Sequence, residues 1–205
     1  AACVEVLDEA LRLAELLATQ PATRHPDAAA LAALLCFQHA RTAARSDAEG
    51  RLVLLPEQDR RRWDAVRIAR GQHWLRRAMA SPVLTPIHLE AGIASAHAAA
   101  ADGASTDWPA IRHWYDQLLA MTASPVVAIN RAVATLQCGD AAAALDQLDQ
   151  IGGSELERYA PLHAARAAAL DALGRRDEAD AARQRALACP LAAPEQRHLL
   201  NGLAR

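Results

Sequence analysis

The chain has 205 residues, a formal net charge of −2 and 52% hydrophobic residues, with aromatic residues at only 3%. A chain of this length can bury roughly 70% of its unfolded surface, so it can build a core without a disulfide or a metal ion. The near-neutral charge argues against a domain devoted to nucleic-acid binding, which would normally be basic. All 22 basic residues are arginine. Schiff-base lysine chemistry and the lysine of a phosphate-binding P-loop are therefore excluded.

The cysteines and the hydropathy pattern indicate the compartment. Cys3, Cys36, Cys138 and Cys189 are far apart and lack the paired spacing of a zinc site. We expect free thiols in a reducing cytoplasm. No signal-peptide pattern and no 18-residue uncharged apolar run is present, so we expect no contact with a membrane. Because the chain opens in a helical pattern, we also expect a fragment of a longer protein.

Alanine is abundant, whereas the β-branched and aromatic runs that strands favour are scarce. This composition predicts an all-α protein. Apolar residues at helical spacing predict helices over 2–18, 26–44 and 57–80. A turn around Gly50 and an extended run over 52–55 separate the last two. In the first helix the expected core-facing residues are Val6, Leu7, Ala10, Leu13, Ala14 and Leu17.

Beyond residue 82 the predicted helices become shorter and regularly spaced, and several begin at a proline. They cover 86–101, 109–122, a helix from 125, 141–150, 161–173, 177–188 and 194–203. Two segments align with a spacing of 35 residues, which places Gly139 on Gly174 and Ala144 on Ala179. Small residues at such positions let neighbouring helix hairpins approach closely. The expected packing residues are Ala132, Gly139, Ala144, Ala167, Gly174 and Ala179.

This period is similar to that of the tetratricopeptide repeat, a helix hairpin of 34 residues. The sequence therefore predicts an N-terminal helical subdomain over 1–82, followed by a short tetratricopeptide-like array over 83–205. Its repeats would span 86–124, 125–158 and 159–191, with a terminal capping helix, and would form an α-α superhelix. A non-repetitive helical bundle is the alternative.

No sequence pattern indicates a catalytic, cofactor or metal site. The HExxH, GxSxG, Walker, GxGxxG and paired-cysteine zinc motifs are all missing from the sequence. We therefore expect no enzyme, no cofactor and no metal ion. An enzyme remains the alternative if His73, His113 or His163 converges with a carboxylate in a pocket.

The helix expected over 57–80 is the most basic segment, with seven arginines interleaved with acidic and apolar residues. A phosphate-binding stripe would need them on one face, and their positions fall in several directions. A solvated basic face is the simplest interpretation. Contact with an acidic protein surface or direct contact with DNA are the alternatives.

The segment LVLLPEQDRRRWD, residues 52–64, concentrates charge at the expected start of this helix. Gln58 and Asp59 suit a helix start, where free N–H groups need acceptors. Arg60 and Asp64 are four apart and could pair across one turn, and Trp63 would pack in the core together with Ile68. We hypothesise a network that holds the 52–55 run on the first helices. In it, Arg41 or Arg45 would pair with Asp47, Asp59 or Asp64.

The same segment, preceded by HARTAARSDAEG, resembles the signature of a C-terminal extension in one group of extracytoplasmic-function (ECF) RNA polymerase sigma factors. The downstream stretches that begin TDWPAIRHWYD and LHAARAAALDA are similar as well, so that the resemblance covers essentially the whole chain. The residues that match the motif are Ala40, Arg41, Ala44, Arg45, Asp47, Gly50, Leu52, Leu54, Gln58, Asp59, Arg60, Trp63 and Asp64.

The resemblance implies a non-catalytic regulatory domain that acts by protein–protein contact. The partners would be the sigma regions of a longer chain or core RNA polymerase, and DNA would be contacted only through those regions. Neither the −10-binding region nor the −35-reading helix-turn-helix of such a sigma factor is present in this sequence. Arg61 and Arg62, which the motif leaves open, are the expected contact surface. The alternative is a free-standing tetratricopeptide adaptor that binds a peptide or a partner protein.

Overall fold

The computed structural model describes residues 2–20, 25–51, 53–151, 153, 156–190, 196 and 200. These residues are mostly helical, which confirms the all-α class, and the helices pack as in an α-α superhelix. The α-helices of the described residues are α1 (Ala2–Thr19), α2 (Pro26–Ala40), α3 (Ala65–Ala78), α4 (Pro86–Ala99), α5 (Trp108–Thr122), α6 (Pro125–Gln137), α7 (Ala141–Asp149), α8 (Ala160–Ala172) and α9 (Arg176–Leu187). Short 3₁₀ helices are η1 (Thr42–Ala44), η2 (Leu55–Glu57), η3 (Arg60–Arg62) and η4 (Leu156–Arg158).

The chain forms two compact units, Ala1–Leu118 and Leu119–Arg205, whereas the sequence predicts the boundary after residue 82. The difference arises because α4 packs against α2 and α3. The side chain of Leu89 in α4 is fully buried, and the Thr85 hydroxyl before α4 donates to Asp27 Oδ1 in α2 over 2.8 Å. Consequently α4 belongs with the N-terminal helices, and the expected repeat over 86–124 is divided between the units.

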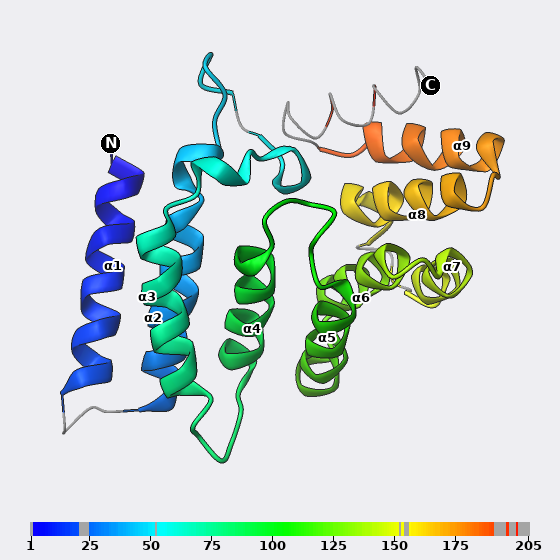
Figure 1. The fold of residues 1–205 in the computed structure, drawn as a ribbon. Helices are drawn as coiled ribbons and strands as arrows, with labels where there is room; N and C mark the ends of the chain where they lie inside the picture. Colours follow the sequence, from blue (N-terminus) through cyan, green and yellow to red (C-terminus); the bar gives the residue numbers. More distant parts are fainter. Residues whose placement is uncertain are drawn as a thin grey trace. The chain divides into compact units, whose positions relative to one another are not determined.

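In the first unit α2 is the central helix and packs against α1, α3 and α4 (Figure 1). Helix α2 is apolar on nearly every side, as expected for a helix surrounded by others. Its start follows the sequence signal, because Pro26 occupies the first helical position and His25 Nδ1 accepts from the Asp27 amide over 3.2 Å. Its buried residues are Ala29, Ala30, Ala32, Ala33, Cys36, Phe37, His39 and Ala40.

Helix α1 buries only part of the face that the sequence predicts: Ala14 is buried, and Leu7 and Ala10 are half-buried. Its buried residues are Leu11, Ala14 and Ala18, two of which are small enough for close helix contact. The indole of Trp74 on α3 fixes this orientation, because its Nε1 donates to Glu15 of α1 over 2.9 Å. The expected core residues that are exposed instead are Val6, Leu13 and Leu17.

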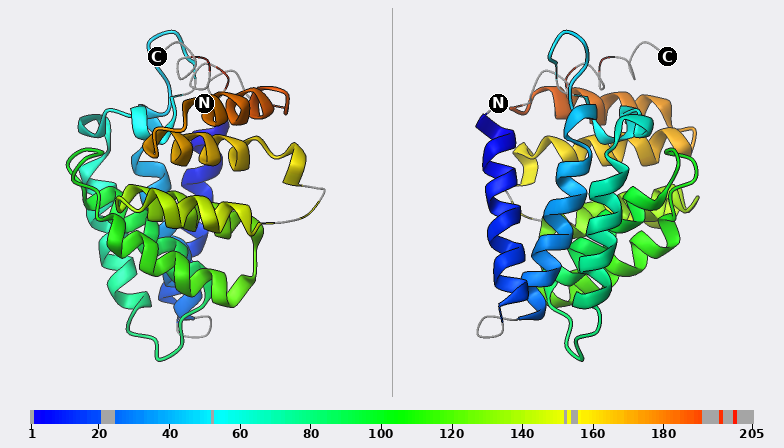
Figure 2. Two further views of the ribbon diagram at one scale, coloured as in Figure 1. Left: turned by 90° about the vertical axis from the view of Figure 1, so that its right-hand side faces the viewer. Right: turned by 60° about the vertical axis from the view of Figure 1, so that its left-hand side comes forward.

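The second unit contains two helix hairpins, α6 with α7 and α8 with α9. Helix α8 also packs against α7 and α6, and α8 and α9 lie side by side in every view (Figures 1 and 2). Gly139 and Gly174 each follow the first helix of a hairpin with φ of 90° and 74°. This left-handed conformation favours glycine at a helix end. The aligned alanines, Ala132, Ala144, Ala167 and Ala179, are all buried between the helices.

Two expectations concern residues that the structure does not describe. They are the position of Leu52 in the extended run and most of the terminal capping helix over 194–203.

Candidate functional site

The residues that follow α2, together with the motif segment 58–64, form the candidate site. The predicted long helix over 57–80 is wrong at its start, because η3 covers Arg60–Arg62 and α3 begins only at Ala65. Asp64, rather than Asp59, is the N-cap of α3, and its Oδ1 accepts from the amides of Val66 (2.9 Å) and Arg67 (3.0 Å). Asp59 caps the short η3 by accepting from the Arg61 amide over 3.0 Å.

Gln58 and Trp63 fix the motif segment in the interior. Gln58 is 7% exposed, and its Nε2 donates to the Val53 carbonyl over 3.1 Å. Trp63 is 8% exposed and belongs to the main core cluster, against which Ile68 also packs, as the sequence predicts. The Asp64 amide donates to the Ala40 carbonyl at the end of α2 over 2.9 Å. The segment is thereby held on the C-terminal end of α2.

Arg60 connects the motif segment to α4 instead of pairing with Asp64. Its guanidinium donates to the carbonyls of His97 and Ala100, the latter over 3.4 Å, and to Thr106 Oγ1 over 3.1 Å. It also lies 5.0 Å from the centre of the Trp63 ring. A cation at the carboxyl end of a helix interacts favourably with the helix dipole. Arg60 therefore caps α4 and fixes the loop that follows it.

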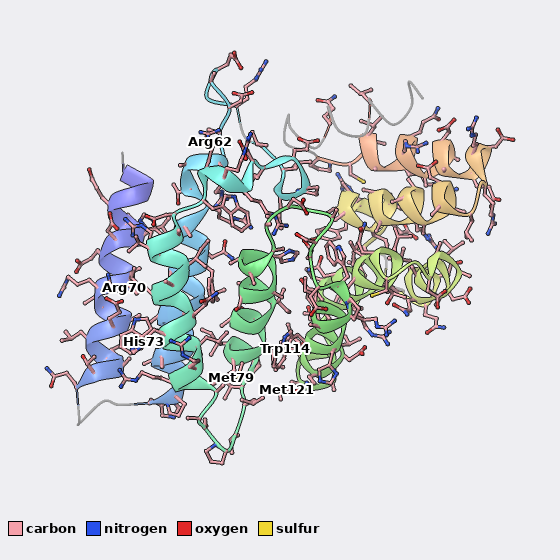
Figure 3. All side chains as sticks on the ribbon, in the orientation of Figure 1. Arg62, Arg70, His73, Met79, Trp114 and Met121 are labelled. Atoms are coloured by element: carbon pink, nitrogen blue, oxygen red, sulfur yellow. The ribbon has the colours of Figure 1, made fainter. Side chains whose placement is uncertain are left out.

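Arg61 and Arg62, the expected contact surface, both have partners within the first unit. Arg61 is 89% exposed in its side chain and pairs with Asp59, at 2.9 Å from Nη2 to Oδ2. Arg62 donates to the carbonyls of Ala43 and Ser46, the latter over 3.2 Å (Figure 3). Arg62 therefore binds the backbone after α2, although both side chains are exposed.

The hypothesised pairing of Arg41 or Arg45 with an aspartate is wrong. Each of the three candidate carboxylates pairs with another arginine: Asp47 with Arg51 (2.7 Å), Asp59 with Arg61 and Asp64 with Arg67 (3.2 Å). The Asp47 carboxylate also accepts from two amides in the turn that Gly50 completes with φ of 77°. The hydrogen bond from Arg51, together with these amides, lowers the pKa of Asp47.

Arg41 is half-buried, and its Nε has no hydrogen-bond partner among the described residues. Burial, followed by the nearby charge of Arg45, lowers the pKa of Arg41. Arg41 and Arg60 also act on His97, whose pKa is lowered to about 4 by burial and by these two charges. The His97 imidazole is therefore neutral at pH 7 and lies 5.4 Å from the Trp108 ring, edge to face.

The histidines proposed for an enzyme lie in three separate environments. His73 is exposed on α3, whereas its neighbour Trp74 is buried. His113 contacts the side-chain amide of Gln117 at 2.8 Å, and His163 Nε2 lies 2.8 Å from the Glu157 carbonyl. Within the described ranges, no group of three metal-ligating side chains is placed to hold an ion.

Two of the four arginines of α3 pair with acidic residues of α1. Arg67 contacts Asp8 (3.3 Å) as well as Asp64, and Arg70 pairs with Glu15 (Figure 3). Arg77 lies 4.7 Å from the centre of the Trp74 ring. These contacts use three of the seven arginines on the segment to hold the first unit together, which is unfavourable for a phosphate-binding stripe.

The chain is similar to proteins whose descriptions name no activity. Residues 2–79 match the model of a family of unknown function (DUF6596). A protein of Rhizobium meliloti (strain 1021), described as uncharacterized, is 38% identical over 196 residues, which cover 95% of this chain and 46% of the relative. The chain thus spans about half the length of that relative. No solved structure matches the chain. In the described part of the chain, no helix has the length and apolar character of a membrane span.

Proposed function

We propose that the chain is a non-catalytic regulatory domain of a bacterial ECF sigma factor that works by protein–protein contact. The partners are the sigma regions of a longer chain or core RNA polymerase, and any DNA contact comes from those regions. The proposal starts from the resemblance of residues 40–64 to the family signature. The relative of about twice the length supports it, because a similar sequence there forms part of a larger protein.

The observation that carries the proposal is that the charged side chains of the motif segment bind groups within the first unit. Every charged side chain from Asp59 to Asp64 has a partner inside the first unit, and these partners are mainly helix ends. A catalytic cluster needs groups directed at a substrate, whereas these groups hold α2, α3 and α4 in fixed positions. A rigid unit of this kind suits a domain that presents a surface to another protein.

The test is transcription in vitro by core RNA polymerase and the full-length protein that carries this domain. We expect removal of the domain to change the transcript yield at least fivefold, and the separate 205-residue chain to bind core polymerase or the isolated sigma regions. The variant Arg76→Gln removes one positive charge from an exposed position on α3 and serves as the control. Unchanged transcription together with no binding to either partner would refute the proposal.

The alternative, a free-standing tetratricopeptide adaptor, is favoured by the two hairpins of the second unit and the packing of α6 on α8. It predicts that residues of α6 and α8 contact a peptide and that the chain acts without attached sigma regions. Binding of a peptide that is lost on substitution of the exposed Asn130 on α6, with no effect on transcription, would favour this adaptor.

A further inference from the structure

Helix α1 carries a row of apolar residues that the first unit leaves largely uncovered. Val6, Leu13 and Leu17 are exposed, and Ala10 is half-buried. Their spacing of four, three and four residues places them on one face of the helix, and it is the spacing of a seam along which two helices pack. Single exposed leucines are ordinary on a protein surface, whereas an aligned row of apolar side chains indicates a contact. We call Val6, Ala10, Leu13 and Leu17 the α1 seam.

The α1 seam lies on the side of α1 that is turned away from α3. Asp8 and Glu15 of α1 face α3, where Asp8 contacts Arg67 over 3.3 Å and Glu15 accepts from the Trp74 indole over 2.9 Å. Each residue of the seam is two positions from Asp8 or Glu15 in the sequence. Because successive residues of an α-helix are about 100° apart, the seam lies about 160° around the helix from the side chains that contact α3.

Helix α2, which lies next to α1 (Figure 1), also presents apolar residues on the side away from α3. The ring of Phe37 on α2 lies against Gly71 of α3. Ala28 and Leu35 are about 180° and 160° around α2 from Phe37, and both are only half-buried. A helix that is apolar on nearly every side is normally covered on every side. The α1 seam and this part of α2 thus form one apolar face of the α1–α2 pair, opposite α3.

We propose that this apolar face binds the aliphatic side of an amphipathic helix, which belongs to the part of a longer protein outside these 205 residues. The occupant is a helix because the α1 seam has helix-packing spacing over about three turns. This inference rests on the proposed function in one respect, since both require the chain to be part of a longer protein. It adds the surface on which the two parts of that protein meet.

The size of the face favours an occupant in the same polypeptide over a separate protein or a second copy of the chain. Its partly exposed side chains offer on the order of 300 Å² of apolar surface, whereas a stable complex of separate proteins buries about 800 Å² on each partner. A tethered segment needs less contact area, because its effective concentration is about millimolar. The Rhizobium meliloti relative has the length for such a segment, since the match covers only 46% of it.

The charge of α1 disfavours a lipid surface as the occupant. The charged residues of α1 are four acids and one arginine, whereas helices that lie on membranes carry mainly lysine and arginine on their polar side. The anionic surface of a membrane would repel the acids of α1. A protein helix with an aliphatic side does not meet this repulsion.

The test compares amide hydrogen exchange of α1 in the 205-residue chain and in the full-length protein that carries it, by mass spectrometry of α1 peptides. A helix that gains a second packing partner opens less often, so we expect α1 to exchange at least fivefold more slowly in the full-length protein. Peptides of α9 in the second unit should exchange equally in both proteins.

Variants of the full-length protein then assign the contact to the α1 seam. The double variant Val6→Gln/Leu13→Gln should return α1 to the exchange rate of the 205-residue chain, within twofold. The control Val66→Gln makes the same change at a similarly exposed valine on α3, 78% against 68% for Val6. It should leave the slow exchange of α1 unchanged within twofold.

Three results would overturn the proposal: equal exchange of α1 in the two proteins, slow exchange that the double variant leaves intact, or the same loss in Val66→Gln. Sedimentation of the 205-residue chain tests the other occupant. A dimer that the double variant dissociates would replace the helix of the longer protein by a second copy of the chain.

Two further measurements separate docking from folding and from transcription. In the 205-residue chain the double variant should keep its melting temperature within about 2 °C, because Val6 and Leu13 are exposed there. A larger fall would mean that the chain itself buries them and would overturn the proposal. Slowed exchange of α1 without an effect of the domain on transcript yield would support docking and count against the role in transcription. A changed transcript yield without slowed exchange would do the reverse.

Discussion

The clearest test of the motif segment compares its two aspartates. Asp64→Ala removes the N-cap of α3, where one carboxylate oxygen accepts from two amides at 2.9 and 3.0 Å. Loss of such a cap costs typically about 1 kcal/mol. The partly exposed contact with Arg67 at 3.2 Å adds a few tenths, roughly 0.3 kcal/mol. For a unit of this size, we expect the melting temperature to fall by about 5 °C.

Tryptophan fluorescence measures this change in the right part of the molecule. All four tryptophans, Trp63, Trp74, Trp108 and Trp114, lie in the first unit, so their emission reports its unfolding separately from that of the second unit. Far-UV circular dichroism follows both units. The loss should therefore appear in the fluorescence melt and only partly in the circular dichroism melt.

The matched control is Asp59→Ala, which removes the cap of a single 3₁₀ turn and a contact with the exposed Arg61. We expect its melting temperature to fall by less than about 2 °C. Equal shifts for the two variants would refute the assignment of Asp64 as the α3 cap. Unchanged stability of Asp64→Ala would contradict the idea that the segment fixes the first unit at all.

The stabilisation that Asp64 provides as the cap of α3 should also depend on pH. The bond from the Arg67 amide, together with that from Val66, lowers the pKa of Asp64. A carboxylate whose pKa is lowered by folding stabilises the protein above its unfolded value, near 3.9 for aspartate, and this contribution is lost as the pH falls through the folded pKa. The difference between wild-type and Asp64→Ala chains should therefore be full at pH 6 and should shrink below about pH 4. A difference that stays constant down to pH 3 would contradict the capping mechanism.

Three further changes test the interior of the first unit. Gly71→Ala places a methyl group 2.8 Å from Cε1 of the buried Phe37 ring, so we expect the first unit to lose about 1–2 kcal/mol of unfolding free energy in the fluorescence melt. Gly103 has open space around it, so the control Gly103→Ala should change that free energy by less than about 0.5 kcal/mol. The lowered pKa of His97, about 4, means that stability is lost as the pH falls from 6.5 toward 4; His97→Gln should flatten the melting temperature over that interval, removing at most about 3 kcal/mol of pH dependence. Burial raises the pKa of the Cys36 thiol to about 11, so at pH 8 a disulfide reagent should modify it only as fast as the first unit unfolds; rapid labelling would show that α2 opens locally.

The helices that the sequence predicts well are those whose ends have local signals. Pro26 and Pro125 mark helix starts in the structure as they do in the sequence, and Gly139 and Gly174 mark ends. The start of α3 carries an ambiguous signal, because Asp59 and Asp64 both suit an N-cap and neither proline nor glycine separates them. The helical pattern therefore extends to residue 57 in the sequence, although the chain forms two 3₁₀ turns there.

Long-range contacts decide what the local pattern leaves open. Arg60 reaches a carbonyl 37 residues away at the end of α4, and no spacing rule indicates that contact. The pairs expected between Arg41 or Arg45 and the distant Asp59 and Asp64 fail for the complementary reason. Arg61 and Arg67 lie within three residues of these two aspartates, and closing a short loop costs less entropy than closing a long one. Loop length does not explain Asp47, because Arg45 is nearer to it in sequence than Arg51; there the Arg51 amide also donates to the carboxylate in the turn.

The contacts of the motif segment divide the residues that match the family signature into two groups. Asp47, Asp59, Arg60 and Asp64 bind backbone groups of turns and helix ends, and they hold α2, α3 and α4 in place. Arg41 is half-buried, and its Nε has no hydrogen-bond partner among the described residues. The capping of helices and turns therefore accounts for the first group, whereas it does not account for the charge of Arg41.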